Sequence, residues 1–172
     1  MNDFEVLPVD AIDETIEEFR DPENEVNLEY LFVPFAMNNA GDQYCFWYHT
    51  PFEASEPPVA LVPHDSDELL VLAKNLQDFI FRKFCETLSD IWDKDIVKEL
   101  KGGLDKALLR THLRYLTAHQ GEVLKDLFSR EVQTFKTKWG DVLGVLSDKE
   151  LEALLQREIG FEELDKAYDY SV

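Results

Sequence analysis

Two groups of side chains in this sequence could in principle form a chemical site, one a metal site and the other a catalytic pair. The first is a short acidic stretch in which His64, Asp65, Asp67 and Glu68 offer four metal-ligand atoms. A calcium loop needs oxygens at fixed offsets over about a dozen residues, with a central glycine and a closing glutamate. This stretch lacks that pattern. An aspartate-rich turn between two strands explains the same residues, and we therefore expect no metal here.

The second group is Cys45 with His49, a candidate nucleophile and base. On a strand the two side chains would share a face, but a rise of ~3.3 Å per residue puts them about 13 Å apart. That distance is too long for a nucleophile–base contact. The sequence also lacks the usual serine-nucleophile, zinc-protease, phosphate-loop and dinucleotide motifs. We expect that the protein is not an enzyme and has no cofactor, and that Cys45 and Cys85 are buried free thiols.

The net charge and its distribution are the most informative features of the composition. The 172 residues carry 36 acidic and 17 basic side chains, a net charge of −19. Residues 1–70 hold 17 of the acids and a single base, Arg20, whereas residues 71–172 hold 19 acids and 16 bases. Such a field repels nucleic acid and anionic membrane surfaces and attracts basic proteins. We therefore expect a protein partner, with no nucleic acid and no membrane, although an acidic surface also serves solubility alone.

The elements that must position these residues fall into two blocks. Ile12, Ile16 and Phe19 recur at helical spacing and predict a short amphipathic helix that ends before Pro22. Residues 30–37, 43–49, 59–64 and 69–73 predict four strands, with Pro34 marking an edge strand or a bulge and Gly41 a tight turn.

From residue 75 the spacing predicts helices over 75–88, 89–100, 104–119, 122–139 and 147–158, then a turn or short helix over 161–170. Breaks are expected at Gly102–Gly103 and at Gly121. The fold class is α+β: an antiparallel sheet of about four or more strands packed with helices, followed by a helical C-terminal half. We divide the chain into residues 1–88 and a helical extension over residues 89–172.

No apolar run is long enough to span a membrane. The first residues show no basic segment followed by an apolar one, as a secretory signal would. Together with the two expected free thiols, these features predict a cytoplasmic protein.

The β region resembles a known family. The similarity covers residues 12–85 and consists of a strand that ends near Pro-Phe-Ala, a Gly-Asp turn, an aromatic strand, a Val-rich strand followed by His-Asp, and a helix entry. It resembles the SUKH superfamily of cell-wall-assembly regulators and bacterial immunity proteins. The residues that carry the similarity are Pro34, Phe35, Ala36, Gly41, Asp42, Tyr44, Cys45, Val59, Leu61, His64, Asp65, Ala73, Leu76, Phe79 and Ile80.

This resemblance implies a non-enzymatic protein-binding domain. Bacterial relatives look like immunity proteins (antitoxins), which bind and neutralise a cognate toxin, often a nuclease. Eukaryotic relatives look like cytosolic regulatory or assembly adaptors, which is the alternative function.

Electrostatics fits the immunity role independently, because a nuclease is cationic where it holds phosphate. The candidate partner-binding residues are acidic side chains near the N-terminus, with aromatic anchors from the sheet. They are Asp13, Glu14, Glu17, Glu18, Asp21, Glu23, Glu25, Trp47, Tyr48 and Phe52. The role of the helical C-terminal half and the oligomeric state stay open at this level.

Overall fold

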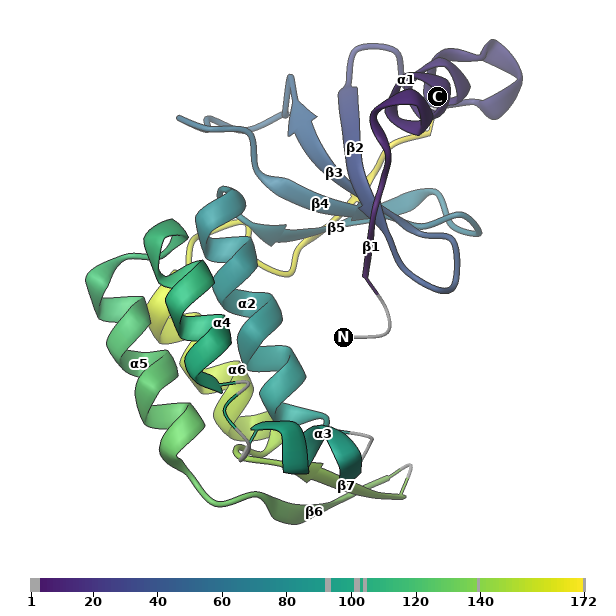
Figure 1. Cartoon of the computed structure of the whole chain (residues 1–172). Helices are drawn as coiled ribbons and strands as arrows, with labels where there is room; N and C mark the ends of the chain where they lie inside the picture. The colour runs from purple at the N-terminus through teal and green to yellow at the C-terminus, as the bar shows by residue number, and fades with distance from the viewer. Residues whose placement is uncertain (1–3, 92–93, 101–102, 104, 139, 172) are drawn as a thin grey trace. The chain divides into compact units, whose positions relative to one another are not determined.

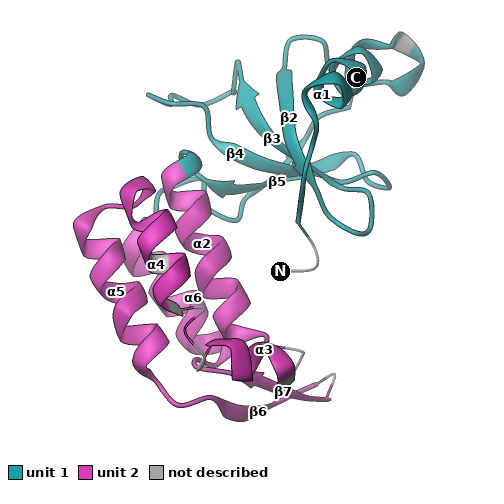
Figure 2. Cartoon of the chain, in the orientation of Figure 1, with its two compact units in different colours: residues 1–76, 161–172 teal, residues 77–160 magenta. Residues whose placement is uncertain are grey.

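The structure, a computed structural model, describes residues 4–91, 94–100, 103, 105–138 and 140–171. The chain forms two compact units, shown in different colours in Figure 2. Unit 1 combines residues 1–76 with residues 161–172, and unit 2 is residues 77–160. The C-terminal segment therefore belongs with the N-terminal one.

Unit 1 is built on an antiparallel six-stranded sheet in the order β1-β2-β3-β4-β5-β8 (Figure 1). Five of its strands follow one another along the chain, and the sixth returns from the C-terminus to pair with β5. One α-helix, α1, packs against β2 and is followed by the short 3-10 helix η1. The elements are β1 (Glu5–Val6), α1 (Val9–Arg20), η1 (Pro22–Asn24), β2 (Leu31–Met37), β3 (Gln43–Tyr48), β4 (Val59–Val62), β5 (Glu68–Ala73) and β8 (Ala167–Asp169).

The turn of the β2–β3 hairpin is stabilised by a glycine and an asparagine side chain. Gly41 adopts a φ of +100°, which a side chain would strain, and the Asn38 side chain accepts hydrogen bonds from the backbone of Ala40 and Asp42. Pro34 lies where the register between β2 and β3 shifts, and β2 has a neighbour on each side. Pro34 therefore marks a bulge and not an edge strand.

One face of this sheet carries the core of unit 1. Phe32, Cys45, Trp47, Ala60 and Leu69 are buried there together with residues from before β2 and after β8. Tyr170 belongs to the same cluster, and its hydroxyl donates to the carbonyls of Pro63 and Ser66 in the β4–β5 loop. The segment after residue 160 is thus an integral part of the sheet domain.

Unit 2 consists of helices and one β-hairpin. Its elements are α2 (Leu76–Ser89), α3 (Lys94–Glu99), α4 (Asp105–His112), the 3-10 helix η3 (Leu113–Tyr115), α5 (Ala118–Ser129), β6 (Gln133–Thr137), β7 (Gly140–Gly144) and α6 (Asp148–Ile159). Capping boxes begin α5 at Thr117 and α6 at Ser147. The hairpin is fixed to α2, because the Val145 N–H donates to the Leu88 carbonyl at 2.8 Å.

The four predicted strands, the α+β class and the N-terminal helix are confirmed. Three expectations for the second half are wrong. The helix predicted over 122–139 ends at Ser129, and residues 133–137 form strand β6. Gly121 does not break a helix but lies inside α5. The segment 161–170 contributes strand β8 instead of a helix, because it pairs with β5.

Parts of the predicted helices over 89–100, 104–119 and 122–139 fall on residues 92–93, 104 and 139, and the predicted break at Gly102–Gly103 falls partly on residue 102. Those residues lie outside the described ones. No helix in the described part of the chain has the length and the apolar character needed to cross a bilayer.

Candidate partner-binding surface

The predicted acidic surface lies on α1 and η1. Helix α1 turns Ile12, Ile16 and Phe19 inward, where the Phe19 ring contacts Phe32 with centroids 5.5 Å apart. The positions between these apolar residues point outward, and the sequence fills them with acids. Asp10 in the first turn and Arg20 in the last turn both suit the helix dipole.

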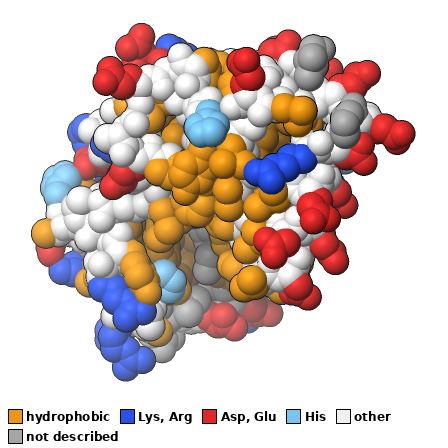
Figure 3. All heavy atoms as spheres, turned by 90° about the horizontal axis from the view of Figure 1, so that it is seen from above, with side chains coloured by type: hydrophobic (Ala, Val, Ile, Leu, Met, Phe, Trp, Pro, Cys, Tyr) orange, Lys and Arg blue, Asp and Glu red, His pale blue; other side chains and the backbone are white. Residues whose placement is uncertain are grey.

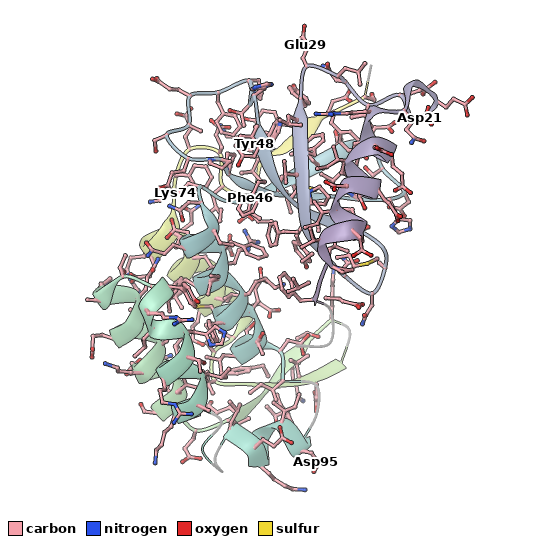
Figure 4. The ribbon with its side chains drawn as sticks, turned by 45° about the horizontal axis from the view of Figure 1, so that its top comes forward. Asp21, Glu29, Phe46, Tyr48, Lys74 and Asp95 are labelled. Carbon is pink, nitrogen blue, oxygen red and sulfur yellow. The ribbon has the colours of Figure 1, made fainter. Side chains whose placement is uncertain are left out.

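All seven predicted carboxylates are exposed: Asp13, Glu14, Glu17, Glu18, Asp21, Glu23 and Glu25. We call this set the acidic surface. Of these seven carboxylates, only that of Asp21 forms a hydrogen bond within the described part of the chain, which it accepts from the Glu23 N–H at 3.0 Å as the cap of η1. Figure 4 shows Asp21 pointing away from the ribbon, and Glu29 does the same in the turn before β2.

No lysine or arginine in the described part of the chain pairs with the acidic surface. By contrast, most ion pairs among the described residues of unit 2 join neighbouring positions along one helix, such as Lys125 with Glu122 and Arg130 with Asp126. Unpaired carboxylates at this density repel one another, and a cationic partner relieves that repulsion. The acidic surface is therefore an electrostatic feature that the fold itself does not neutralise.

The predicted aromatic anchors divide into three cases. Trp47 is fully buried, with its ring 5.1 Å from Tyr30 and 5.3 Å from Tyr168 between centroids, so its assignment as a surface anchor is wrong. Strand alternation explains this, because Trp47 faces the core side of the sheet. Phe52 is half-buried against the Trp47 ring. Tyr48 is 40 % exposed and is the one of the three that is open to a partner (Figure 4).

A hollow that the sequence did not reveal lies beside the acidic surface. Its volume is about 130 Å³, and it is formed by the end of α1, the segment leading into β2 and the residue after β3. Its lining is Ile16, Phe19, Arg20, Val26, Leu28, Tyr30, Leu31, Phe32 and His49. In Figure 3, hydrophobic side chains gather on the face shown, next to a basic side chain, and acidic side chains lie beyond it. The only feature of the sequence that pointed to this hollow was Arg20, the single lysine or arginine among the 17 acids of residues 1–70.

The His64–Asp65 stretch holds a structural contact. His64 Nδ1 lies 2.8 Å from Asp42 Oδ1, which also accepts the His64 backbone N–H. The carboxylate raises the pKa of His64. Partial burial would raise the pKa of Asp42, but hydrogen bonds from His64 and Asn38 outweigh burial and hold it below its usual value. Asp42, His64 and Asp65 could each offer one ligand atom to a metal. In the structure, the contact between Asp42 and His64 joins the β2–β3 turn to the β4–β5 loop.

The two cysteines are buried and free. Burial raises the pKa of the Cys45 thiol far above its usual range. Burial, with the nearby carboxylates of Glu86 and Glu158, does the same at Cys85. A nucleophilic cysteine needs a lowered pKa and access to solvent, so neither thiol has the environment of a nucleophile.

Comparison with known families gives one match: residues 1–82 match the family model described as SMI1 / KNR4 family (SUKH-1). The match spans β1 to β5 with α1 and the first half of α2, and it includes the whole acidic surface. Neither the curated proteins nor the solved structures contain a match to this chain.

Proposed function

Residues 1–82 of this chain belong to the SUKH superfamily, and on that premise we propose that the protein is an immunity protein that neutralises a basic toxin. A protein-binding role follows from the family. The finer proposal is that the acidic surface covers the cationic active site of a toxin, for which a nuclease is the best candidate, in a one-to-one complex. Its action requires no reaction and no cofactor of its own.

The observation that supports this proposal is the combination of exposure and lack of pairing on α1 and η1. Seven carboxylates face solvent within thirteen residues, and no cation of the described residues is paired with them. A nuclease presents lysines and arginines where it binds phosphate. Carboxylates of suitable spacing can occupy the same positions and exclude the substrate.

Charge also favours fast capture, which an immunity protein needs. A concentrated field of one sign raises association rates by about 10- to 1,000-fold. At physiological salt the Debye length is about 8 Å, so steering acts over the last stage of approach. Neutral contacts around the charged ones then set how slowly the complex dissociates.

The alternative is a regulatory or assembly adaptor. Residues 83–172 lie outside the family match, and most of them form unit 2, a compact body of its own. An adaptor would use this unit for a second contact. The two functions differ in which surface the partner needs.

Charge-matched variants of the full chain separate the two. The first variant combines Asp13→Asn, Glu14→Gln, Glu17→Gln and Glu18→Gln on α1. The control combines Asp90→Asn, Glu99→Gln, Asp141→Asn and Glu152→Gln, which are exposed acids of unit 2. Both variants lose the same four charges. Tagged full-length protein first captures the partner from the lysate of the source organism, and we expect a basic protein that is toxic when expressed alone.

Co-expression and binding then give the answer. We expect wild type and the unit 2 control to relieve the toxicity, while the α1 variant binds with an on-rate about tenfold lower and fails to protect at matched expression. If the unit 2 control no longer binds the captured partner and the α1 variant binds it as wild type does, the adaptor function is favoured. A captured partner that is acidic or harmless argues against the immunity role.

A further inference from the structure

The hollow beside α1 has the dimensions of a site for one side chain. Ligand sites for small molecules have volumes of roughly 300–1,000 Å³, and this hollow has about 130 Å³. An engineered protein cavity of about 150 Å³ lined by aliphatic and aromatic groups holds one benzene molecule. The hollow is therefore too small to enclose a nucleotide-sized ligand, and its volume fits a single aromatic or branched apolar side chain.

Apolar side chains make up most of the lining of the hollow, which is partly open to solvent. Ile16 and Phe19 come from the inner face of α1, Leu31 begins β2, and Tyr30 directly precedes it. Leu28 also lines it and is 64 % exposed, so apolar surface at the hollow is in contact with water. An apolar group that enters the hollow removes this surface from water.

Arg20 stands at this hollow without a partner. It is the only base in residues 1–70, it is exposed, and among the described residues it forms no ion pair and no hydrogen bond through its guanidinium. An unpaired arginine among so many carboxylates offers five donors to an incoming acceptor. The flat guanidinium is suited to a carboxylate, which it binds through two parallel hydrogen bonds.

His49 adds a second polar group to the same hollow. Its backbone φ is +57°, a left-handed conformation that is uncommon for residues other than glycine. The residue directly follows β3, is exposed and lines the hollow. His49 is therefore a second polar residue, beside Arg20, at the lining of this hollow.

Charge decides which acceptor suits the site. A phosphate or a nucleic acid brings two or more negative charges into a region whose first 70 residues have a net charge of −16. That region repels such ligands. A single carboxylate next to an apolar side chain, carried by an otherwise basic protein segment, satisfies Arg20 while the flanking cations satisfy the acidic surface.

We propose that the hollow anchors one apolar side chain of a basic protein partner, and that Arg20 binds a carboxylate adjacent to that side chain. This proposal rests on the proposed function, because it describes the same interface. The anchor supplies affinity in the manner of a buried hot spot, and the Arg20–carboxylate contact distinguishes this partner from other cationic proteins.

The direction in which Arg20→Ala changes the affinity for a basic partner distinguishes this inference from simple attraction between opposite charges. Arg20→Ala makes the acidic surface more negative, so charge attraction alone predicts tighter binding of a basic partner. The anchor model predicts weaker binding. Arg20 is exposed in the last turn of α1, so its removal is compatible with folding. Arg110→Ala, at an exposed arginine of α4, is the matched control that removes the same charge from unit 2.

Three acetylated and amidated peptides serve as the probe, with NMR amide shifts of the full chain as the measurement. The first is Lys-Lys-Phe-Glu-Lys-Lys, and the second replaces its glutamate with glutamine. The third replaces the phenylalanine with alanine. The glutamine peptide has the higher positive charge, so charge attraction alone ranks it first.

We expect the Phe-Glu peptide to bind about three- to fivefold more tightly than either control, in line with an exposed ion pair and one buried ring. Shifts are expected at the amides of Leu28, Leu31 and His49. The preference for glutamate is lost in Arg20→Ala and kept in Arg110→Ala.

Two results overturn the inference. In one, the glutamine peptide binds as tightly as the glutamate peptide or more tightly. In the other, no amide around the hollow shifts at millimolar peptide. If all three peptides bind equally along α1 in a salt-sensitive way, the anchor is wrong and the proposed acidic interface stands. If no peptide binds at low salt, both proposals fail.

Discussion

The imidazole of His64 and the carboxylate of Asp42 lie 2.8 Å apart and connect two loops that are 22 residues apart in the sequence. Asp42 ends the β2–β3 turn, and His64 lies in the β4–β5 loop. A second bond, from the His64 backbone N–H to the same carboxylate oxygen, strengthens the link. The contact predicts how the stability of unit 1 depends on pH.

Each partner of this contact stabilises the fold over its own pH range. The folded pKa of His64 is raised, so its contribution is complete below about pH 6.5 and is lost as the pH rises through the folded value. The folded pKa of Asp42 is lowered, so its contribution is complete above about pH 4 and is lost as the pH falls through the folded value. We therefore expect the contact to contribute most near pH 5.

Asp42→Ala tests this prediction. Loss of the acceptor is expected to lower the free energy of unfolding by about 1–2 kcal/mol at pH 5, and by less at pH 8. Urea denaturation at the two pH values measures the difference, and NMR titration of the imidazole should give a lower pKa for His64 in the variant. Glu53→Gln, an exposed loop position, is the control. An unchanged His64 pKa would exclude the contact.

The sheet was predictable because its residues interact locally. Asn38 and Gly41 determine the β2–β3 turn, and Ile12, Ile16 and Phe19 determine the buried face of α1. Even the irregularity at Pro34 was visible, because proline removes a backbone donor from the ladder. Exposure of the acidic residues followed from the same helical spacing.

The errors lie where distant contacts decide the structure. Residues 133–137 have no helix breaker before them, yet they pair with β7, which is hydrogen-bonded to the end of α2. The chain after residue 160 forms a strand only because β5 offers it an edge. The hollow combines Arg20 with His49, which are 29 positions apart, so no local pattern could indicate it.

Trp47 and Tyr48 are neighbours in β3 with opposite environments, 0 % and 40 % exposed. Trp47→Ala is expected to lower the free energy of unfolding by about 3–5 kcal/mol, because it leaves a cavity among four aromatic rings. Tyr48→Ala should cost less than about 1 kcal/mol. Chemical denaturation compares the two. If Tyr48→Ala lowered the free energy of unfolding more than Trp47→Ala, Tyr48 and not Trp47 would be the core residue.

Gly144 lies at the end of β7 where the backbone of α2 approaches closely. A Cβ at this position would be 2.4 Å from the Ser89 carbonyl oxygen, which cannot move without shifting the helix. Gly144→Ala is therefore expected to destabilise unit 2 by about 1–3 kcal/mol.

Gly121→Ala is the matched control. Its Cβ would meet only the end of the flexible Leu113 side chain, at 2.8 Å. Alanine also favours the helix by up to about 1 kcal/mol, so the two effects should nearly cancel. Thermal unfolding of both variants makes the comparison. Equal losses of stability would show that β7 does not lie against α2 as described.

The buried thiols should react slowly. Since burial raises the pKa of both Cys45 and Cys85, little thiolate exists at neutral pH. A thiol reagent such as Ellman's reagent is expected to modify neither cysteine of the native protein within minutes, and to modify both after denaturation. The single variants Cys45→Ser and Cys85→Ser assign the reaction. Rapid modification of one native thiol would identify an exposed, reactive cysteine and reopen the question of catalysis.

The most direct test of the central claim is the association rate of the captured partner as a function of ionic strength. Stopped-flow measurements between 50 and 500 mM NaCl compare wild type with the α1 variant that lacks four carboxylates. If the acidic surface steers the partner, the logarithm of the wild-type on-rate falls steeply with rising salt, and the variant shows a clearly smaller slope. Identical slopes for the two proteins would contradict the account.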